Sequence, residues 1–261
     1  MRVHSLNCGT MLPRVVGRLV CHVLLCETDD GLVLVDTGFG TQDLAAPARR
    51  LGLARFALAL ADDPAETALA QVQALGFTAQ DVRHVVLTHL DLDHAGGLAD
   101  FPQALVHTTA AEHAAAVTDL ALRDSARYRP PQWSHGPRWR TYEGPGEQWQ
   151  GLSAHGLEGL GAGFALVPVP GHSRGHAAVA VDTGQGWLLH AGDAAFDRST
   201  VDPSEPRNRA LLAFEQLVAH DRSQVAANHA RLAELQTRDD VRVITAHDPE
   251  LLAREQARAG R

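Results

Sequence analysis

Short runs of apolar residues, each bounded by glycine, proline or aspartate, recur along this chain of 261 residues. Continuous apolar runs of about four to eight residues are typical of strands that are buried on both faces. The first two runs are joined by Asp29-Asp30-Gly31, which is a turn signal for a hairpin. The strands predicted in this way are Leu19–Cys26, Gly31–Asp36, Val85–Leu87, Ala104–His107, Phe164–Val169, Ala177–Asp182, Trp187–His190 and Asp240–Thr245.

Between these runs, apolar positions at helical spacing predict amphipathic helices. The clearest one, Pro64–Leu75, is opened by Asp63-Pro64 and closed by Gly76. Strands and helices alternate at both ends of the chain and strands dominate its middle, which indicates an α/β protein. The other predicted helices are Asp43–Leu60 with a connection in its second part, Ala110–Leu122, Arg209–His220, Ser223–Leu235 and Pro249–Arg258.

The overall charge argues against a nucleic-acid partner, because the chain carries a net charge of −8 and such a partner requires a basic surface. The three cysteines, Cys8, Cys21 and Cys26, form no CxxC pair and fit buried thiols in a reducing compartment. The first residues show no signal-peptide pattern, and no apolar run reaches the roughly 18 residues of a membrane span. We therefore expect a cytoplasmic protein without a membrane partner.

Potential metal ligands cluster in the segment Thr88–Gly97, directly after an apolar run. If this segment leaves the sheet in an extended form, His89 and Asp91 point to one side. Asp93 and His94 then lie across the turn and can serve a second centre. Imidazole and carboxylate ligands together suit Zn, Mn or Fe better than Ca²⁺ or Mg²⁺.

The pattern His89-x-Asp91-x-Asp93-His94 resembles the H-x-H-x-D-H signature of the metallo-β-lactamase superfamily, with Asp91 where the second His usually stands. Four further segments resemble other elements of this family, in the family's order. They are Leu32–Gly38, Pro170–His176, Leu188–Asp193 and Val243–Asp248. This resemblance implies a four-layer αββα sandwich built from two similar halves, in one domain that spans residues 1–261.

The resemblance also implies a centre of two divalent ions, with Zn as the first expectation and Mn or Fe as alternatives. Asp36 and His176 would lie behind the ligands, Asp36 orienting a ligand imidazole and His176 acting as a hydrogen-bonding residue. Asp93 would have a catalytic role in addition. The implied ligands are His89, Asp91 and His172 for one ion, Asp93, His94 and His247 for the other, and Asp193 as the bridge.

A hydroxide that bridges two ions can cleave an ester, lactone or thioester without a nucleophilic side chain, and the chain contains no GxSxG motif. Asp91 changes the charge, because two divalent ions, three carboxylates and one hydroxide sum to zero. The extra anion should raise the pKa of the bridging water and favour Mn or Fe more than usual. An arrangement with Asp91 off the metal, and one ion held by Asp93, His94 and His247, stays open.

The leading functional hypothesis is thus a metal-dependent hydrolase of a small molecule, nearest to the lactonase and glyoxalase II-like branch. Bacterial acyl-homoserine lactonases carry a Tyr three residues after the bridging Asp, where this chain has Phe196. Because Phe196 has no hydroxyl group, this difference speaks against specificity for acyl-homoserine lactones. Two alternatives are a diiron redox or oxygen-binding protein, suggested by Asp91, and a non-catalytic sensor that retains the fold. A homodimer is also open.

Residues 123–150 break the strand and helix pattern, since they hold five of the six Trp and Tyr residues together with four prolines. We interpret this segment as an insert that lies over the metal site. Trp133, His135 and Trp139, together with Phe196, would then form a substrate wall. The alternative is that the aromatic residues form a small core that closes an edge of the fold.

Overall fold

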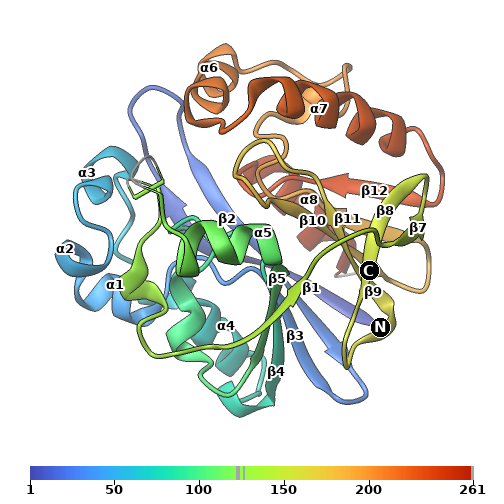
Figure 1. Cartoon of the computed structure of the whole chain (residues 1–261). Helices are drawn as coiled ribbons and strands as arrows, with labels where there is room; N and C mark the ends of the chain where they lie inside the picture. Colours follow the sequence, from blue (N-terminus) through green and yellow to red (C-terminus); the bar gives the residue numbers. More distant parts are fainter. Residues whose placement is uncertain (122–123, 126, 260–261) are drawn as a thin grey trace.

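Two six-stranded sheets pack face to face, and helices cover their outer faces, in a computed structural model that describes residues 1–121, 124–125 and 127–259 (Figure 1). This is the four-layer arrangement that the sequence predicts. None of the helices in these ranges combines the length and apolarity needed to cross a membrane.

Each sheet is built from one part of the chain. The first sheet contains β1 (Arg2–Met11), β2 (Leu19–Thr28), β3 (Gly31–Val35), β4 (Val82–Val86), β5 (Leu105–Thr109) and β6 (Arg138–Tyr142), in this order. The second contains β12 (Val241–Ile244), β11 (Trp187–His190), β10 (Ala177–Asp182), β9 (Gly161–Pro168), β8 (Leu152–Leu157) and β7 (Glu147–Trp149), in this order. The two halves meet at the face between the sheets.

The helices are mostly short. Those in the first half are α1 (Thr41–Ala45), α2 (Pro47–Arg50), α3 (Ala54–Leu58), η1 (Pro64–Glu66), α4 (Ala68–Ala74), η2 (Ala79–Asp81), η3 (Gly96–Asp100), α5 (Ala110–His113) and the π-helix η4 (Ala114–Thr118). Later ones are η5 (Pro130–Gln132), η6 (Arg198–Thr200), α6 (Arg209–Val218), α7 (Arg222–Gln236) and α8 (Pro249–Ala259).

Three buried apolar clusters correspond to the three spaces between the four layers. Successive side chains of β2 alternate between two of them, because neighbouring residues of a strand point to opposite faces. Leu25 packs under the helices of the first half, while Leu24 packs between the sheets beside Leu166 of β9. The third cluster joins the outer face of the second sheet to Leu232 of α7. Burial on both faces explains why the strands read as continuous apolar runs.

Two predicted helices are interrupted. Pro64–Leu75 is split at Thr67, whose ψ of 144° is extended and whose hydroxyl accepts a hydrogen bond from Ala70 N (3.2 Å) as the N-cap of α4. The segment Asp43–Leu60 forms three short helices rather than one, and Pro47 begins the second of them. The predicted helix Ala110–Leu122 becomes α5 and η4, while Leu122 lies outside the described residues.

The aromatic segment 123–150 supplies edge strands, apart from Arg123 and Ala126, which lie outside the described residues. β6 extends the first sheet beside β5, and β7 extends the second sheet beside β8. Trp133 is buried in the core of the first half. Trp149 packs against the outer core of the second half. The aromatic residues therefore close edges of the fold, as the alternative interpretation predicts.

Candidate metal centre

The segment that carries the first ligands leaves the sheet at the carboxyl end of β4, a central parallel strand. Its two glycines pack against the segment that follows β3. A Cβ at Gly96 would lie 2.1 Å from Asp43 Oδ2, and one at Gly97 would lie 3.0 Å from Thr37 Cβ. The glycines thus allow the close backbone contact that fixes the turn after His94.

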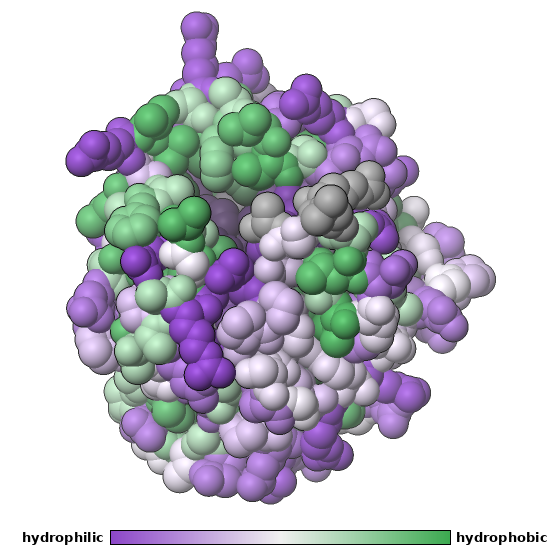
Figure 2. Space-filling view, turned by 60° about the vertical axis from the view of Figure 1, so that its left-hand side comes forward, coloured by the Kyte–Doolittle hydropathy of each residue, from purple (hydrophilic) through white to green (hydrophobic). Residues whose placement is uncertain are grey.

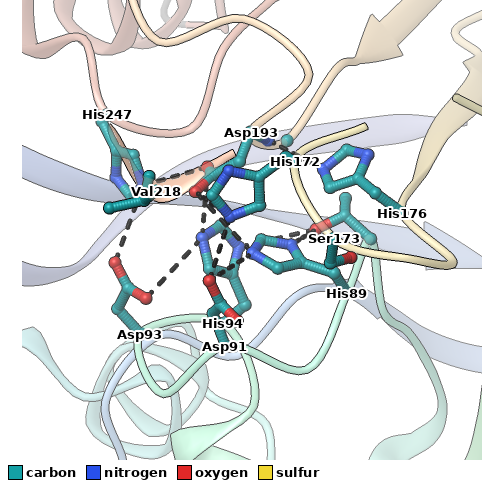
Figure 3. A network of polar contacts seen from close by, with 12 residues as sticks. His89, Asp91, Asp93, His94, His172, Ser173, His176, Asp193, Val218 and His247 are labelled. Atoms are coloured by element: carbon teal, nitrogen blue, oxygen red, sulfur yellow. Dashed lines mark hydrogen bonds and ion pairs between the residues drawn. The ribbon is translucent and has the colours of Figure 1, made fainter. Parts of the chain in front are cut away.

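Seven predicted ligands converge here from both halves of the chain (Figure 3). The first ligand group is formed by His89, Asp91, His172 and Asp193, and the second by Asp93, His94 and His247. In each group one atom per residue lies within 4.8 Å of all the others. His89 and Asp91 lie on an extended stretch, and a turn closed by the hydrogen bond from His94 N to Asp91 O (3.0 Å) carries Asp93 and His94 to the other group, as the sequence predicts.

Asp193 lies between the two groups with one oxygen toward each. Its Oδ2 is 3.7 Å from His89 Nε2 and 3.4 Å from His172 Nε2. Its Oδ1 is 3.3 Å from His94 Nε2 and 3.0 Å from His247 Nε2. Two ligand atoms of one tetrahedral ion, each about 2.1 Å from it, lie roughly 3.4 Å apart. These separations therefore fit two ions that share the Asp193 carboxylate.

Unpartnered buried atoms also fit metal binding. His89 Nε2, His94 Nε2, Asp91 Oδ1 and Asp193 Oδ1 are buried and form no hydrogen bond to the described residues. Buried polar atoms rarely lack a partner unless an ion or water satisfies them. Zn, Mn or Fe suits this set of imidazoles and carboxylates.

Contacts behind the ligands orient three of the imidazoles. His89 Nδ1 lies 3.0 Å from Thr88 Oγ1. His94 Nδ1 is 2.8 Å from Asp36 Oδ2, and the same carboxylate accepts hydrogen bonds from Thr88 N and Thr88 Oγ1, both at 2.8 Å. His247 Nδ1 is 2.9 Å from Val20 O. Each contact directs Nε2 toward the centre and fixes which nitrogen carries the proton. Asp36 therefore lies where the sequence predicts an orienting residue.

His176 contacts the centre from behind. Its Nε2 accepts a hydrogen bond from Asp193 N (2.9 Å), and its ring packs against that of His89 with 4.8 Å between centroids. It belongs to neither ligand group. His176 thus has the position of a hydrogen-bonding residue that holds the bridging aspartate.

Two residues that the sequence did not single out contact the ligand segments. Glu112 is fully buried and accepts hydrogen bonds from Leu90 N (3.0 Å), Ser173 Oγ (2.7 Å), Gly175 N (3.0 Å) and Tyr128 Oη (2.9 Å). It thereby joins the loop of the first two ligands to the loop of His172.

The second such residue is Arg127. Its Nη1 lies 2.7 Å from Asp91 Oδ2 and 2.7 Å from His172 Nε2, and its Nη2 donates to Val218 O at the end of α6. Asp91 also pairs backbone to backbone with Tyr128, the next residue. The guanidinium of Arg127 thus contacts two ligands of the first group. Among the described residues, no arginine makes such a contact with the second group.

The two groups carry positive charge differently. Burial opposes protonation, but Asp193 and Asp93 raise the pKa of His247 to about 9. In the first group burial lowers the pKa of His172, and Arg127 acts in the same direction. Burial alone would raise the pKa of Asp91, but Arg127 and His89 hold it well below its usual range. Without bound ions, the positive charge of the second group is therefore carried by protonated imidazole, and that of the first group by the guanidinium of Arg127.

The centre lies at the base of a cleft of about 490 Å³. Figure 2 shows apolar side chains gathered around this hollow. The ring of Phe196 packs 5.3 Å from His172 and 5.5 Å from His247. The apolar part of the lining consists of Met11, Leu19, Ala54, Ala57, Leu58, Leu92, Phe196, Phe214, Leu217 and Val218, and the polar part of Asp91, Asp93, Arg127, His172, Asp193 and His247.

Only Phe196 of the four residues expected in a substrate wall lines this cleft. Trp133 is 7% exposed in the core of the first half, and Trp139 packs against the same core. His135 is exposed near Asp100 and Arg50. The prediction that these three side chains face the substrate is wrong, because tight packing places the tryptophans in the core. Among the described residues of the aromatic segment, Arg127 is the one that lines the cleft.

The sequence profile of the metallo-beta-lactamase superfamily matches residues 16–247. A probable metallo-hydrolase of Mycobacterium tuberculosis is 51% identical, over 98% of this chain and 84% of that protein. The N-acyl homoserine lactonase AttM of Azorhizobium caulinodans is 32% identical, over 71% of this chain and 65% of that protein.

A crystal structure of a variant of AiiA from B. thuringiensis, with N-decanoyl-L-homoserine bound at the active site, has the same fold. The TM-score is 0.72 at 20% identity, over 98% of this chain and 95% of that one. The predicted fold class is thus confirmed. With the profile match and the similar metallo-hydrolases, these findings show that the chain belongs to the metallo-β-lactamase superfamily and is a metallo-hydrolase.

Proposed function

We propose that this metallo-hydrolase cleaves a carboxylic ester, lactone or thioester of a small molecule with an apolar acyl group. The observation that carries the proposal is the position of the seven ligands at the base of a largely apolar cleft. An acyl chain in that cleft would pack on side chains such as Phe196 and Leu217, with its carbonyl carbon near the ligands. Burial of apolar surface stabilises such a complex by about 25 cal/mol per Å².

Two divalent ions held by these residues would lower the pKa of a shared water and stabilise the negative charge that develops on the carbonyl oxygen. The side chains have separate tasks. Asp193 would fix the distance between the two metal positions, because one of its oxygens faces each group. Asp93 belongs to the second group and also lines the cleft, so its carboxylate can accept a proton from water or pass one to the leaving oxygen. Phe196 covers two ligand imidazoles and limits the access of bulk water.

Lactones are a natural part of the substrate class, since the relatives include N-acyl homoserine lactonases at about 30% identity. The residue three positions after Asp193 is nevertheless Phe196, which has no hydroxyl to donate to a carbonyl oxygen. We therefore place the acyl-homoserine lactones among several candidate substrates and do not single them out.

A panel of acyl esters, acyl lactones and thioesters with increasing acyl length tests the proposal. We expect turnover that rises with acyl length, disappears on chelation and returns with Zn or Mn. Asp29→Ala, in the exposed hairpin turn after β2, serves as the control and should match the unmodified protein. Turnover that survives complete chelation would refute metal catalysis. An iron-loaded protein with visible absorption and no turnover would favour the redox alternative.

A further inference from the structure

The guanidinium of Arg127 lies among the atoms that form the first ligand group. Nη1 is 2.7 Å from both Asp91 Oδ2 and His172 Nε2, which are themselves 3.0 Å apart. Arg127 is 15% exposed and Asp91 17%, so the pair is largely screened from solvent. In the second group no arginine contacts Asp93, His94 or His247 among the residues that the structure describes.

The contact with His172 excludes metal binding by the same atom. A neutral imidazole nitrogen offers one lone pair, which either accepts a hydrogen bond or binds a cation. While Arg127 donates to His172 Nε2, that nitrogen cannot coordinate an ion. An ion at about 2.1 Å from this nitrogen would also meet the positive charge of the guanidinium at close range.

The partner of Arg127 is the one ligand that departs from the family signature. Asp91 stands where the signature has a His, so it adds one negative charge to the first group. Arg127 adds one positive charge beside it (2.7 Å). The pair therefore has the net charge of a neutral imidazole, and the guanidinium supplies a cation that does not dissociate at any ordinary pH.

We propose that Arg127 competes with a metal ion for the first ligand group, so that the two positions load unequally. The second group binds one ion tightly. The first group binds an ion only when Arg127 leaves His172 and turns into the cleft. The proposal rests on the metal-binding part of the proposed function and adds a difference in affinity between the two positions.

The surroundings of Arg127 allow this movement. The side chain lines the cleft, which has space for it, and Val218 O at the end of α6 accepts its other nitrogen. The backbone that follows Arg127 is held in place, because Tyr128 is buried and donates to Glu112 Oε1 (2.9 Å). A turn of the side chain alone is therefore sufficient.

Calorimetric titration of the chelator-treated protein with Zn²⁺, supported by metal analysis after dialysis, tests the proposal. We expect two binding events in the unmodified protein, with the weaker one at least about tenfold weaker. Arg127→Met should tighten the weaker event by about tenfold or more, because it frees His172 Nε2 and removes a cation that repels the ion. Arg14→Met removes an equal charge from an exposed position on the β1–β2 connection and should leave both events unchanged.

Two further variants test the same contact in case Arg127→Met does not fold. Arg127→Gln is uncharged and polar, and should tighten the weaker event in the same way. Asp91→His removes the carboxylate that holds Arg127 and should also bring the two affinities together. Absorption of the Co²⁺-loaded protein would show separately whether one or two positions are filled at one equivalent.

Two equal binding events in the unmodified protein would overturn the inference, as would a weaker event that none of these variants tightens. Either result leaves the proposed hydrolase intact, since both positions would still bind metal. Absence of any binding event in all variants would instead refute the metal centre itself.

Discussion

The two ligand groups use the same kinds of side chain but are supported differently. In the second group, the carboxylate of Asp36 and the carbonyl of Val20 hold the Nδ1 atoms of His94 and His247. In the first group, His172 Nδ1 has no hydrogen-bond partner in the described part of the chain. A guanidinium contacts its Nε2 instead.

The difference is confined to His172 and Asp91, since in the first group Thr88 Oγ1 also holds His89 Nδ1 (3.0 Å). Ligands that are oriented from behind lose little freedom when an ion binds, which favours affinity. On our proposal, His172 and Asp91 must first be released from the guanidinium of Arg127.

Removing the shared ligand should abolish the difference by disabling both groups. Asp193→Ala deletes the carboxylate whose two oxygens serve them. We expect metal content to fall at both positions and kcat/KM to drop by about a thousandfold or more, which corresponds to roughly 4 kcal/mol. Metal analysis and turnover of the best ester on the panel measure this. An enzyme that keeps one full equivalent would show that the bridge is dispensable.

The pH dependence of stability should report on the second group. In the protein without ions, the pKa of His247 is raised to about 9 from its ordinary 6.5, so protonation stabilises the folded state. This stabilisation is fully present below about pH 6.5 and is lost as the pH rises through 9. It amounts to roughly 3 kcal/mol. Urea unfolding of the chelated protein across this range measures it.

A His247→Asn variant provides the control for this slope and should show a shallower one. Part of the slope remains because, although burial opposes protonation of His94, Asp193 and Asp36 hold its pKa well above the usual range. The three cysteines add to the slope at the upper end of this range, because burial raises the pKa of each thiol in the folded protein while the thiols of the unfolded chain ionise near their ordinary pKa. The variant keeps all three thiols, so the difference between the two slopes isolates His247. A slope of the same size in the variant would assign the effect to other groups.

Weakening the support of the second group should bring it closer to the first. Asp36→Asn removes the charged acceptor behind His94 and should lower the affinity of the tight event by about 10- to 100-fold. Asp36 has a φ of 60°, a conformation that Asn also tolerates, so the backbone can be retained. Zn²⁺ titration measures the change. An unaltered tight event would mean that Asp36 serves the fold and not the ion.

The smallest effect is expected at the cleft wall, away from both groups. Leu217 is 73% exposed and lines the cleft. Leu217→Ala should raise KM for long acyl esters by roughly three- to tenfold and leave metal content unchanged, since about 1 kcal/mol of apolar contact is lost. Equal effects on short and long acyl esters would argue against acyl binding at this wall.

Much of the centre could be predicted from the sequence because the ligands occur in short segments at strand ends. His89 and Asp91 lie on one side of an extended stretch, and the turn that follows Asp91 places Asp93 and His94 at the second group. His172, Asp193 and His247 could be placed only through the resemblance, since their convergence depends on how two sheets dock. Strands β10 and β11 were predicted with the observed bounds, because turns mark their ends.

The parts that could not be predicted depend on contacts between distant segments. Arg127 has no local pattern, and its role follows from Asp91, which lies 36 residues away. Thr109-x-x-Glu112 resembles a capping box, which is a purely local role for Glu112. The sequence therefore gives no sign of the four long-range hydrogen bonds that Glu112 accepts. Trp133 and Trp139 suggested a substrate wall because they stand among prolines in a segment that breaks the strand and helix pattern. Only the packing shows that they belong to the core and the sheet edge.

Each ligand group takes residues from both sheets, since Asp193 and the later histidines come from the second half and the first motif from the first. An ion bound at either position would therefore cross-link the two halves of the sandwich. Through thermodynamic linkage, the stability of the sandwich would increase with the concentration of free metal. The same cations that activate water would then also stabilise the protein against unfolding. Loss of metal would lower both the catalytic activity and the free energy of unfolding.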